Sequence, residues 1–373
     1  MNKNLYSIGL MSGTSMDGVD ASIIKSDGEQ FIEIIENIYL KYDNQLKLEL
    51  KKVIDSCKTK EDFNKYLKSI KEIEKKITIK HAEACKKIMK KKQGLKIDVI
   101  GFHGQTILHK PHKGYSIQIG DPNLLLNLTK ASIISDFRNN DILNGGQGAP
   151  LTPLYHKLIS LKINSKFPIV FVNIGGITNI TYLENKNKIE SFDSGPGNFL
   201  IDAWVKSRSK LDYDDKGKLA RLGKTNENIL KDFLKKPYYK KKFPKSLDVK
   251  EFNLNNVKKL NLEDGCSTLS MLTVKSICMA INSLKKKPST IIFSGGGRKN
   301  KFIINSIKKI LNKSVSLIDE FDFDGDFIES QAFAYLAIRS YLNKFITLPS
   351  TTGVKSPCRG GKILKLKDSN FVT

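Results

Sequence analysis

The fold of this chain is decided close to its start, where residues 8–21 read Ile8-Gly9-Leu10-Met11-Ser12-Gly13-Thr14-Ser15-Met16-Asp17-Gly18-Val19-Asp20-Ala21. Apolar residues lead into and out of a segment of glycines, hydroxyls and carboxylates, and this pattern predicts a strand, a tight turn and a second strand. Gly13 and Gly18 allow positive φ and let backbone N–H groups approach a ligand closely. The hydroxyls can donate hydrogen bonds, and Asp17 and Asp20 can hold a cation directly or through water. The stretch is typical of a site for the phosphates of a magnesium nucleotide, although ordinary hairpins with polar turns are also common.

Other phosphate loops are excluded by spacing. Residues 217–225 read GKLARLGKT, but the first glycine is one residue too far from Gly223-Lys224-Thr225, and no apolar strand precedes it. No G-x-G-x-x-G motif opens a helix after a strand, and no G-x-S-x-G motif is present, which argues against a dinucleotide fold and a hydrolase nucleophile elbow. The opening stretch remains the best candidate for binding phosphate.

Composition bounds the class of protein. The chain has 373 residues, enough for two domains with separate cores, and is 40% hydrophobic. No apolar run has the length needed to span a bilayer, and the N-terminus makes a poor signal peptide, so no membrane partner is expected. Five separated cysteines without a C-x-x-C motif predict reduced thiols, a cytoplasmic location and no zinc knuckle.

The net charge of +25 suggests a nucleic-acid-binding protein. However, only six of the 63 basic residues are arginine, and specific base recognition favours arginine. The lysines are spread over expected helix faces. We therefore predict a solvated lysine-rich surface and no nucleic-acid partner, with some attraction of anionic substrates.

The order of elements indicates a duplicated α/β fold. Residues 1–40 predict strands, residues 44–92 helices, and residues 97–102 a buried strand that leads into a glycine-flanked turn at His103. A second unit begins near residue 167, and residues 267–287 predict a long helix. Both halves open with a strand, a glycine-bearing hairpin and another strand. We predict two similar domains, residues 1–160 and 161–373, that close on a nucleotide.

Two segments of the second half are candidates for catalysis and for ligand binding. Asp193 follows a strand and precedes a Pro-Gly turn, so its carboxylate can act as a general base or as a second-shell partner of magnesium; the alternative is an Asx turn or helix cap. Gly295, Gly296 and Gly297 follow an apolar strand and permit close approach of a planar ligand, or of a phosphate at the next helix.

Three residues of other segments are further candidates. His103 is interpreted as a sugar-binding donor, because no cysteine or carboxylate completes a zinc site around it. Arg138 can pair with a substrate carboxylate, or with Asp136 or Asp141 as a structural ion pair. Glu329 opens a helix, where an acid is also favourable simply through the helix dipole.

Ten motifs occur in one order from residue 8 to about residue 353, and together they resemble the anhydro-N-acetylmuramic acid kinase family. They are the opening stretch, His103-Gly104-Gln105-Thr106, Gln118-Ile119-Gly120-Asp121, Asp136-Phe137-Arg138, Gly145-Gly146-Gln147-Gly148-Ala149-Pro150-Leu151, Asn173-Ile174-Gly175-Gly176-Ile177, Phe192-Asp193-Ser194-Gly195-Pro196-Gly197-Asn198, Phe243-Pro244-Lys245-Ser246, Ser294-Gly295-Gly296-Gly297 and Glu329-Ser330-Gln331-Ala332-Phe333-Ala334. The opening stretch and the Gly-Gly-Gln-Gly-Ala-Pro segment are the most specific.

The resemblance implies a two-domain actin-like ATPase with an interdomain nucleotide cleft, which uses ATP and Mg²⁺ and forms a homodimer. It implies a reaction in which water opens the 1,6-anhydro ring of anhydro-N-acetylmuramic acid and ATP phosphorylates O6, in peptidoglycan recycling. Asp193 would activate the water, and Glu329 would hold a substrate hydroxyl or the water.

The resemblance also assigns binding residues. ATP and its phosphates would contact Gly13, Thr14, Ser15, Met16, Asp17, Gly18, Val19, Asp20, Gly175, Gly176, Gly295, Gly296 and Gly297. The sugar would contact His103, Gln105 and Arg138, and Asp17 would bind the magnesium ion.

One segment departs from the family pattern. Leu247-Asp248-Val249-Lys250-Glu251 replaces the usual Thr-Gly-Arg-Glu after Pro-Lys-Ser, which puts contacts from this loop in question. The alternative functions are a conventional hexosamine kinase without ring cleavage and an ATP-driven binding or polymer-forming protein.

Overall fold

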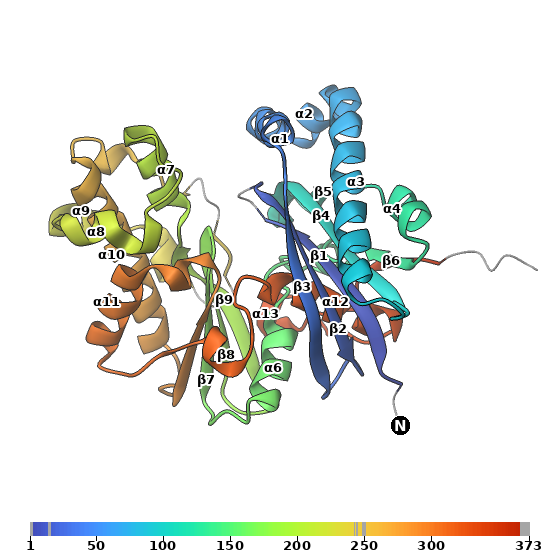
Figure 1. Ribbon diagram of the computed structural model, residues 1–373. Coiled ribbons are helices and arrows are strands. Elements are labelled where there is room, and N and C mark those ends of the chain that lie inside the picture. Colours follow the sequence, from blue (N-terminus) through green and yellow to red (C-terminus); the bar gives the residue numbers. More distant parts are fainter. Residues whose placement is uncertain (1–2, 14–15, 242, 244, 248–250, 366–373) are drawn as a thin grey trace, which may run out of the picture. The chain divides into compact units, whose positions relative to one another are not determined.

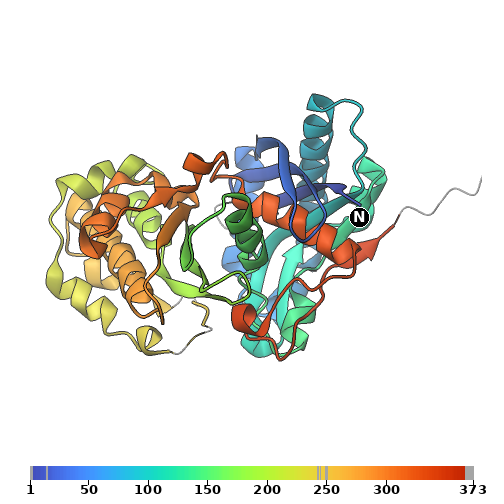
Figure 2. The same cartoon turned by 90° about the horizontal axis from the view of Figure 1, so that it is seen from below.

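The computed structural model describes residues 3–13, 16–241, 243, 245–247 and 251–365. The chain forms two compact units: Met1–Lys162 together with Glu329–Thr373, and Ile163–Ile328 (Figures 1 and 2). This differs from the predicted division into 1–160 and 161–373, because the C-terminal segment returns to the first unit. Each unit contains one sheet and its own helices, so the predicted mixed α/β class with two sheet-containing units is confirmed.

The first unit is built on a seven-stranded sheet with the order β12-β6-β4-β1-β2-β3, in which β5 also pairs with β4. Its strands are β1 (Leu5–Ser12), β2 (Gly18–Ser26), β3 (Ile32–Lys41), β4 (Val99–Lys110), β5 (Tyr115–Ile119), β6 (Ser132–Ser135) and β12 (Lys362–Leu364). Its helices are α1 (Asn44–Ser56), α2 (Lys60–Lys65), α3 (Leu67–Lys91), α4 (Pro122–Thr129), α5 (Asn139–Leu143), α6 (Pro153–Lys162), α12 (Ile328–Tyr341) and α13 (Pro349–Thr352).

Helices cover both faces of this sheet. Large side chains of its central strands face α3, and glycines face α12. Ile8 and Leu10 of β1 enter the core that α3 shares, and α3 runs along the sheet in Figure 1. Gly9 between them points to the opposite face, where a Cβ atom would lie 1.9 Å from the carbonyl oxygen of Ser330 in α12. Gly101 of β4 makes the same close approach to the carbonyl oxygen of Phe333. The two glycines therefore let α12 lie directly on the sheet.

The second unit is built on a five-stranded sheet with the order β11-β10-β7-β8-β9. Its strands are β7 (Ile169–Ile174), β8 (Ile177–Leu183), β9 (Ile189–Pro196), β10 (Thr290–Ser294) and β11 (Ser316–Leu317). Its helices are α7 (Phe199–Arg208), α8 (Lys218–Leu222), α9 (Glu227–Leu234), α10 (Leu262–Asn282) and α11 (Lys301–Leu311), with short 3₁₀ turns at Gly296–Lys299 and Ile318–Phe321.

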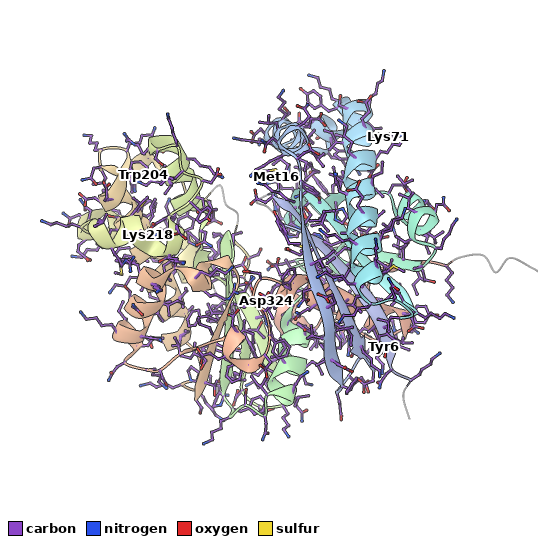
Figure 3. The ribbon with its side chains drawn as sticks, viewed as in Figure 1. Tyr6, Met16, Lys71, Trp204, Lys218 and Asp324 are labelled. Atoms are coloured by element: carbon purple, nitrogen blue, oxygen red, sulfur yellow. The ribbon has the colours of Figure 1, made fainter. Side chains whose placement is uncertain are left out.

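The core of this unit lies around α10, which packs against α7, α8, α9, α11 and β9. Trp204 of α7 is buried there, and its indole N–H donates to the carbonyl of Leu262 at 2.9 Å (Figure 3). Gly265 of α10 leaves the space that the indole fills. Trp204 thus joins α7 to the start of α10.

Two predictions from composition can be compared with the structure. The five cysteines are free and buried, in agreement with the prediction of reduced thiols. Among the described residues, no helix is both long and apolar enough to cross a membrane.

Candidate active site

The opening stretch forms the predicted hairpin. β1 and β2 pair antiparallel from Leu5 to Met11, and Met16 lies in the turn between the two strands (Figure 3). The N–H of Met16 donates to the carbonyl of Gly13 at 3.1 Å, and Met16 has a φ of +57°. Thr14 and Ser15, which were predicted to bind phosphate, lie outside the described residues.

The turn is held from β4 by Gln105. Its side-chain oxygen accepts from the hydroxyl of Ser12 at 2.6 Å, and its amide nitrogen donates to the carbonyl of Gly13 at 3.2 Å. Tyr42 donates to the same Ser12 hydroxyl at 3.0 Å. Gln105, predicted to contact the sugar, thus braces the β1–β2 turn. The sequence predicted the hydroxyl of Ser12 as a donor to a ligand, but it did not predict the contacts of that hydroxyl with Gln105 and Tyr42, because both partners lie far from Ser12 in the chain.

Asp17 is the predicted magnesium ligand, and its carboxylate forms an ion pair with Lys47 of α1. The described residues contain no group of three or more histidines, cysteines and carboxylates that could enclose a metal ion. Magnesium bound to a nucleotide needs only one or two protein carboxylates, because phosphate oxygens and water supply the other ligands. Asp17, half-exposed beside the turn, fits that limited role once it releases Lys47.

His103 lies inside β4, not in the predicted turn, and both of its ring nitrogens have partners. Nδ1 lies 2.8 Å from the carbonyl oxygen of Gly104, which can only accept, so the proton is on Nδ1. Nε2 then accepts from Nε of Arg138 at 3.0 Å. Burial, together with the charge of Arg138, holds the pKa of His103 well below its usual value. The imidazole is therefore neutral and fixes Arg138.

Arg138 has a second fixed contact, from Nη1 to the carbonyl of Gly148 at 2.7 Å. Burial lowers the pKa of Arg138 to about 10, while the charges of Glu329 and Asp141 act to raise it. Glu329, in the first turn of α12, therefore lies within electrostatic range of the guanidinium. Asp141 serves the loop instead of pairing with Arg138: it accepts from the N–H of Gly148 at 2.7 Å.

Asp193 of β9, in the second unit, contacts the first residue of the segment that departs from the family pattern, and two residues that precede it. Its Oδ2 accepts from the N–H of Leu247 at 2.8 Å, and its own N–H donates to the carbonyl of Lys245 at 2.9 Å. Tyr238 donates its hydroxyl to the carbonyl of Asp193 at 2.5 Å. The contacts from Lys245 and Leu247 use backbone groups of the loop and do not depend on its side chains, whereas the contact from Tyr238 uses a side-chain hydroxyl. Asp248, Val249 and Lys250 lie outside the described residues.

These surroundings shift the pKa of the Asp193 carboxylate. Burial raises its pKa to about 7, although the N–H of Leu247 and the charge of Lys245 act to lower it. The ammonium of Lys245 is itself held over the ring of Tyr238, 4.5 Å from its centre. A carboxylate with a pKa near neutrality can take a proton from a substrate or water at physiological pH. Tyr238, Lys245 and Leu247 are partners of Asp193 that only the folded chain reveals.

The predicted glycine segments of the second unit converge at the end of β7. The carbonyls of Gly175 and Gly176 accept from the N–H groups of Asn198 at 2.8 Å and Gly197 at 2.9 Å. A Cβ atom at Gly295 would lie 2.3 Å from the side-chain oxygen of Asn173, and one at Gly297 would lie 2.2 Å from Ile174. At Gly296 a Cβ atom would meet nothing within 4 Å. The loop therefore packs tightly at its two ends and presents open backbone at its middle.

The structure thus groups the predicted residues by unit. The first unit holds the β1–β2 turn, Gln105, His103, Arg138 and Glu329. The second holds Asp193 and the glycine segments around residues 175–176 and 295–297.

Comparison with known proteins gives a consistent result. The family model described as anhydro-N-acetylmuramic acid kinase matches residues 5–365. The chain is 48% identical to the anhydro-N-acetylmuramic acid kinase of Pelagibacter ubique, over 98% of this chain and 100% of that protein. It is 40% identical to the protein of the same name from Rhizobium etli, over 95% and 97%, and 37% identical to the one from Zymomonas mobilis, over 96% and 99%.

Solved structures are more distant. A ROK family glucokinase from Streptomyces griseus, in complex with glucose and AMPPNP, aligns with a TM-score of 0.40 at 10% identity, over 89% of this chain and 99% of that chain. A TM-score of this size decides nothing about the site.

Proposed function

Since this chain belongs to the anhydro-N-acetylmuramic acid kinase family, we propose that it opens the 1,6-anhydro ring of anhydro-N-acetylmuramic acid with water and phosphorylates O6 from ATP. The product is N-acetylmuramic acid 6-phosphate, an intermediate of peptidoglycan recycling. The predicted family, and with it the predicted phosphotransferase, are confirmed by the match over nearly the whole chain.

The observation that carries the proposal is the environment of Asp193. Its carboxylate has a pKa of about 7, and the N–H of Leu247 fixes one of its oxygens. The other oxygen takes a proton from the water that attacks C1, the anomeric carbon. The bond from C1 to O6 breaks, and O6 attacks the γ-phosphorus of ATP, so both steps share the charge that develops on O6.

Residues of the first unit suit recognition of the sugar. Of the five N–H donors of Arg138, one is used by His103 and one by Gly148, which leaves three for a substrate carboxylate. Because neutral His103 accepts from Nε, the guanidinium plane is oriented before the substrate binds. Glu329 nearby accepts a hydrogen bond from a substrate hydroxyl or from the attacking water.

ATP binding uses the two groups of glycines. The β1–β2 turn cradles phosphates with backbone N–H groups, and the open backbone at Gly296 accommodates the nucleotide. Magnesium, when bound, neutralises charge on the phosphate oxygens; Asp17 would hold it directly or through water. The buried free thiols support a cytoplasmic location. The homodimer remains a prediction from the family resemblance.

The substitution Asp193→Asn tests the proposal. Asparagine keeps an oxygen for the N–H of Leu247, so the fold is retained, but it cannot take a proton at neutral pH. We expect kcat for the anhydro sugar to fall about 10²- to 10⁴-fold, as measured by ADP release and by the mass of the phosphorylated sugar.

A matched control is Asp215→Asn, which removes an exposed carboxylate from the same unit and should leave kcat unchanged. If Asp193→Asn retains full activity, Asp193 is not the base. If the wild type ignores the anhydro sugar and phosphorylates free hexosamines, the chain is a conventional hexosamine kinase.

A further inference from the structure

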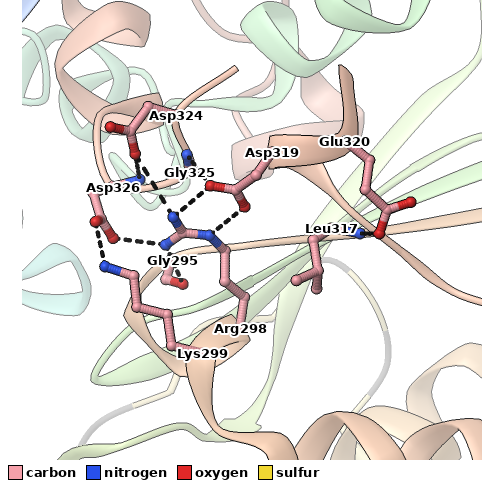
Figure 4. Close-up of polar contacts among 9 residues, drawn as sticks. All are labelled: Gly295, Arg298, Lys299, Leu317, Asp319, Glu320, Asp324, Gly325 and Asp326. Carbon is pink, nitrogen blue, oxygen red and sulfur yellow. Dashed lines mark hydrogen bonds and ion pairs between the residues drawn. The ribbon is translucent and has the colours of Figure 1, made fainter. Parts of the chain in front are cut away.

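Arg298, which has no part in the proposed reaction, anchors the glycine loop that follows β10. The guanidinium of Arg298 is buried, and its side chain is only 4% exposed. Nε and Nη2 donate to the two carboxylate oxygens of Asp319, each at 2.7 Å, and Nη1 donates to Asp326 at 2.6 Å (Figure 4). Nη1 also reaches the carbonyl of Gly295 at 3.2 Å. One side chain thus holds both the glycine loop and residues 319–326.

Backbone contacts join the same two segments. The N–H of Gly295 donates to the carbonyl of Gly325 at 3.3 Å, and the N–H of Gly325 donates to Asp319 at 3.3 Å. A Cβ atom at Gly325 would lie 2.3 Å from Nε of Arg298, so only glycine lets the guanidinium lie against this backbone. The two segments therefore form one closely packed unit around the guanidinium.

The charges around Arg298 hold the arrangement firmly. Asp324 lies 3.6 Å from Nη2, so three carboxylates face one guanidinium, and Lys299 forms a further ion pair with Asp326. Burial acts to lower the pKa of Arg298, but the hydrogen bonds of Asp319 and Asp326 outweigh it and the pKa lies above its usual value. Bidentate contacts of this kind fix direction as well as distance, which a lysine cannot reproduce.

The segment that Arg298 holds leads directly to Glu329. Asp326 is the third residue before Glu329, and α12 begins at Ile328. The chain leaves the second unit between Ile328 and Glu329. Arg298 therefore contacts both the glycine loop and a residue three positions before Glu329.

We propose that Arg298 is a positioning residue: it couples occupation of the Gly295–Gly297 loop by the nucleotide to the placement of Glu329. The proposal rests on the proposed function, since it requires ATP at this loop. In this arrangement the anhydro ring is opened only after the nucleotide is bound.

Hydrogen–deuterium exchange with a non-hydrolysable ATP analogue tests the coupling on the full chain. In the wild type we expect the analogue to slow exchange both in residues 294–300 and in residues 319–328. Asp326→Asn removes the negative charge from the contact nearest Glu329 and leaves a weaker, neutral hydrogen bond. In this variant we expect protection of residues 294–300 to remain and that of residues 319–328 to fall about tenfold. Arg298→Lys should have the same effect. Asp326 is 39% exposed, so its variant decides the question if Arg298→Lys does not fold.

Asp322→Asn is the matched control. Asp322 lies in the same segment at a φ of +61°, a conformation that asparagine also tolerates, and the substitution should leave both protections unchanged. Turnover adds a second readout: uncoupling should let ring opening proceed without phosphoryl transfer, so Asp326→Asn should release ring-opened sugar that carries no phosphate, with the KM for ATP little changed.

The outcomes separate the two ideas. The role of Arg298 is overturned if the analogue protects residues 294–300 but not residues 319–328 in the wild type, or if both segments stay protected in both variants. The proposed ATP site would stand in either case. Absence of any protection at residues 294–300 in the wild type contradicts the ATP site itself, and the inference falls with it.

Discussion

At Asp193, burial and hydrogen bonding act on the carboxylate in opposite directions, and burial prevails, which gives a pKa of about 7. At His103 burial and a neighbouring cation act together, and the ring stays neutral. The sequence predicted Asp193 and His103 as site residues because of their positions beside glycine turns, and Arg138 because its guanidinium can pair with a substrate carboxylate. It could not predict that His103 orients Arg138, because that depends on which ring nitrogen the Gly104 carbonyl engages.

The pH dependence of catalysis follows from Asp193. The base must be ionised, so kcat/KM for the anhydro sugar should rise about tenfold per pH unit below pH 6 and level off above pH 7 to 8. Steady-state rates between pH 5 and pH 9 measure this profile. A profile that is flat through pH 7 would exclude Asp193 as the titrating base.

The same group has a consequence for stability. The pKa of Asp193 is raised above its value in the unfolded chain, so the folded state binds more protons between about pH 4 and pH 7. Its contribution to the free energy of unfolding therefore falls as the pH rises through this window. Asparagine does not titrate, so Asp193→Asn does not lose stability in this way. The melting temperature of the variant minus that of the wild type should therefore be larger at pH 8 than at pH 5. An equal difference at both pH values would contradict the raised pKa.

Arg138 should act on the sugar and not on ATP. Arg138→Lys keeps the charge but loses the fixed plane and the contact between Nε and His103. We expect KM for the anhydro sugar to rise about tenfold or more while the KM for ATP stays within about twofold. Initial rates with each substrate varied in turn give both constants; an effect confined to ATP would refute the assignment.

Among the elements, α12 connects packing to the site. Its first turn carries Glu329, and its position is set by the two glycines beneath it, Gly9 and Gly101. Periodicity in the sequence predicted this helix and the opening hairpin well. It located α10 less well: the predicted range of 267–287 is shifted from the observed Leu262–Asn282, because the side chain of Asn261 caps the helix earlier.

The close approach of α12 to the sheet can be tested with Gly101→Ala. The new methyl group would lie 2.4 Å from the carbonyl oxygen of Phe333, so α12 must shift. We expect the free energy of unfolding to fall by about 1–3 kcal/mol, together with a loss of kcat through Glu329. Urea denaturation and initial rates measure the two effects.

A control for this test is Gly94→Asn, at a φ of +82° with no atom within 4 Å of the added Cβ. Asparagine tolerates this conformation, so stability should change little. If Gly101→Ala is as stable and active as this control, the packing of α12 does not position Glu329.

For the whole molecule, the chain order of the motifs and the presence of two α/β units were predictable, whereas the path of the C-terminal segment was not. Residues 329–373 return to the first unit through α12 and through β12, which pairs with β6 far earlier in the chain. Such pairing depends on contacts between distant residues, and local periodicity carries no information about it. The nucleotide cleft between the two units stays a prediction.

The central claim is that one enzyme couples ring hydrolysis to phosphoryl transfer, and turnover of 1,6-anhydro-N-acetylmuramic acid with Mg-ATP in ¹⁸O-labelled water tests it most directly. We predict a sugar with one ¹⁸O atom at C1 and with the phosphate on an unlabelled O6. Asp193→Asn should lose both the label at C1 and the phosphate on O6. A phosphorylated sugar that retains the anhydro ring, or that carries no label at C1, would contradict the account.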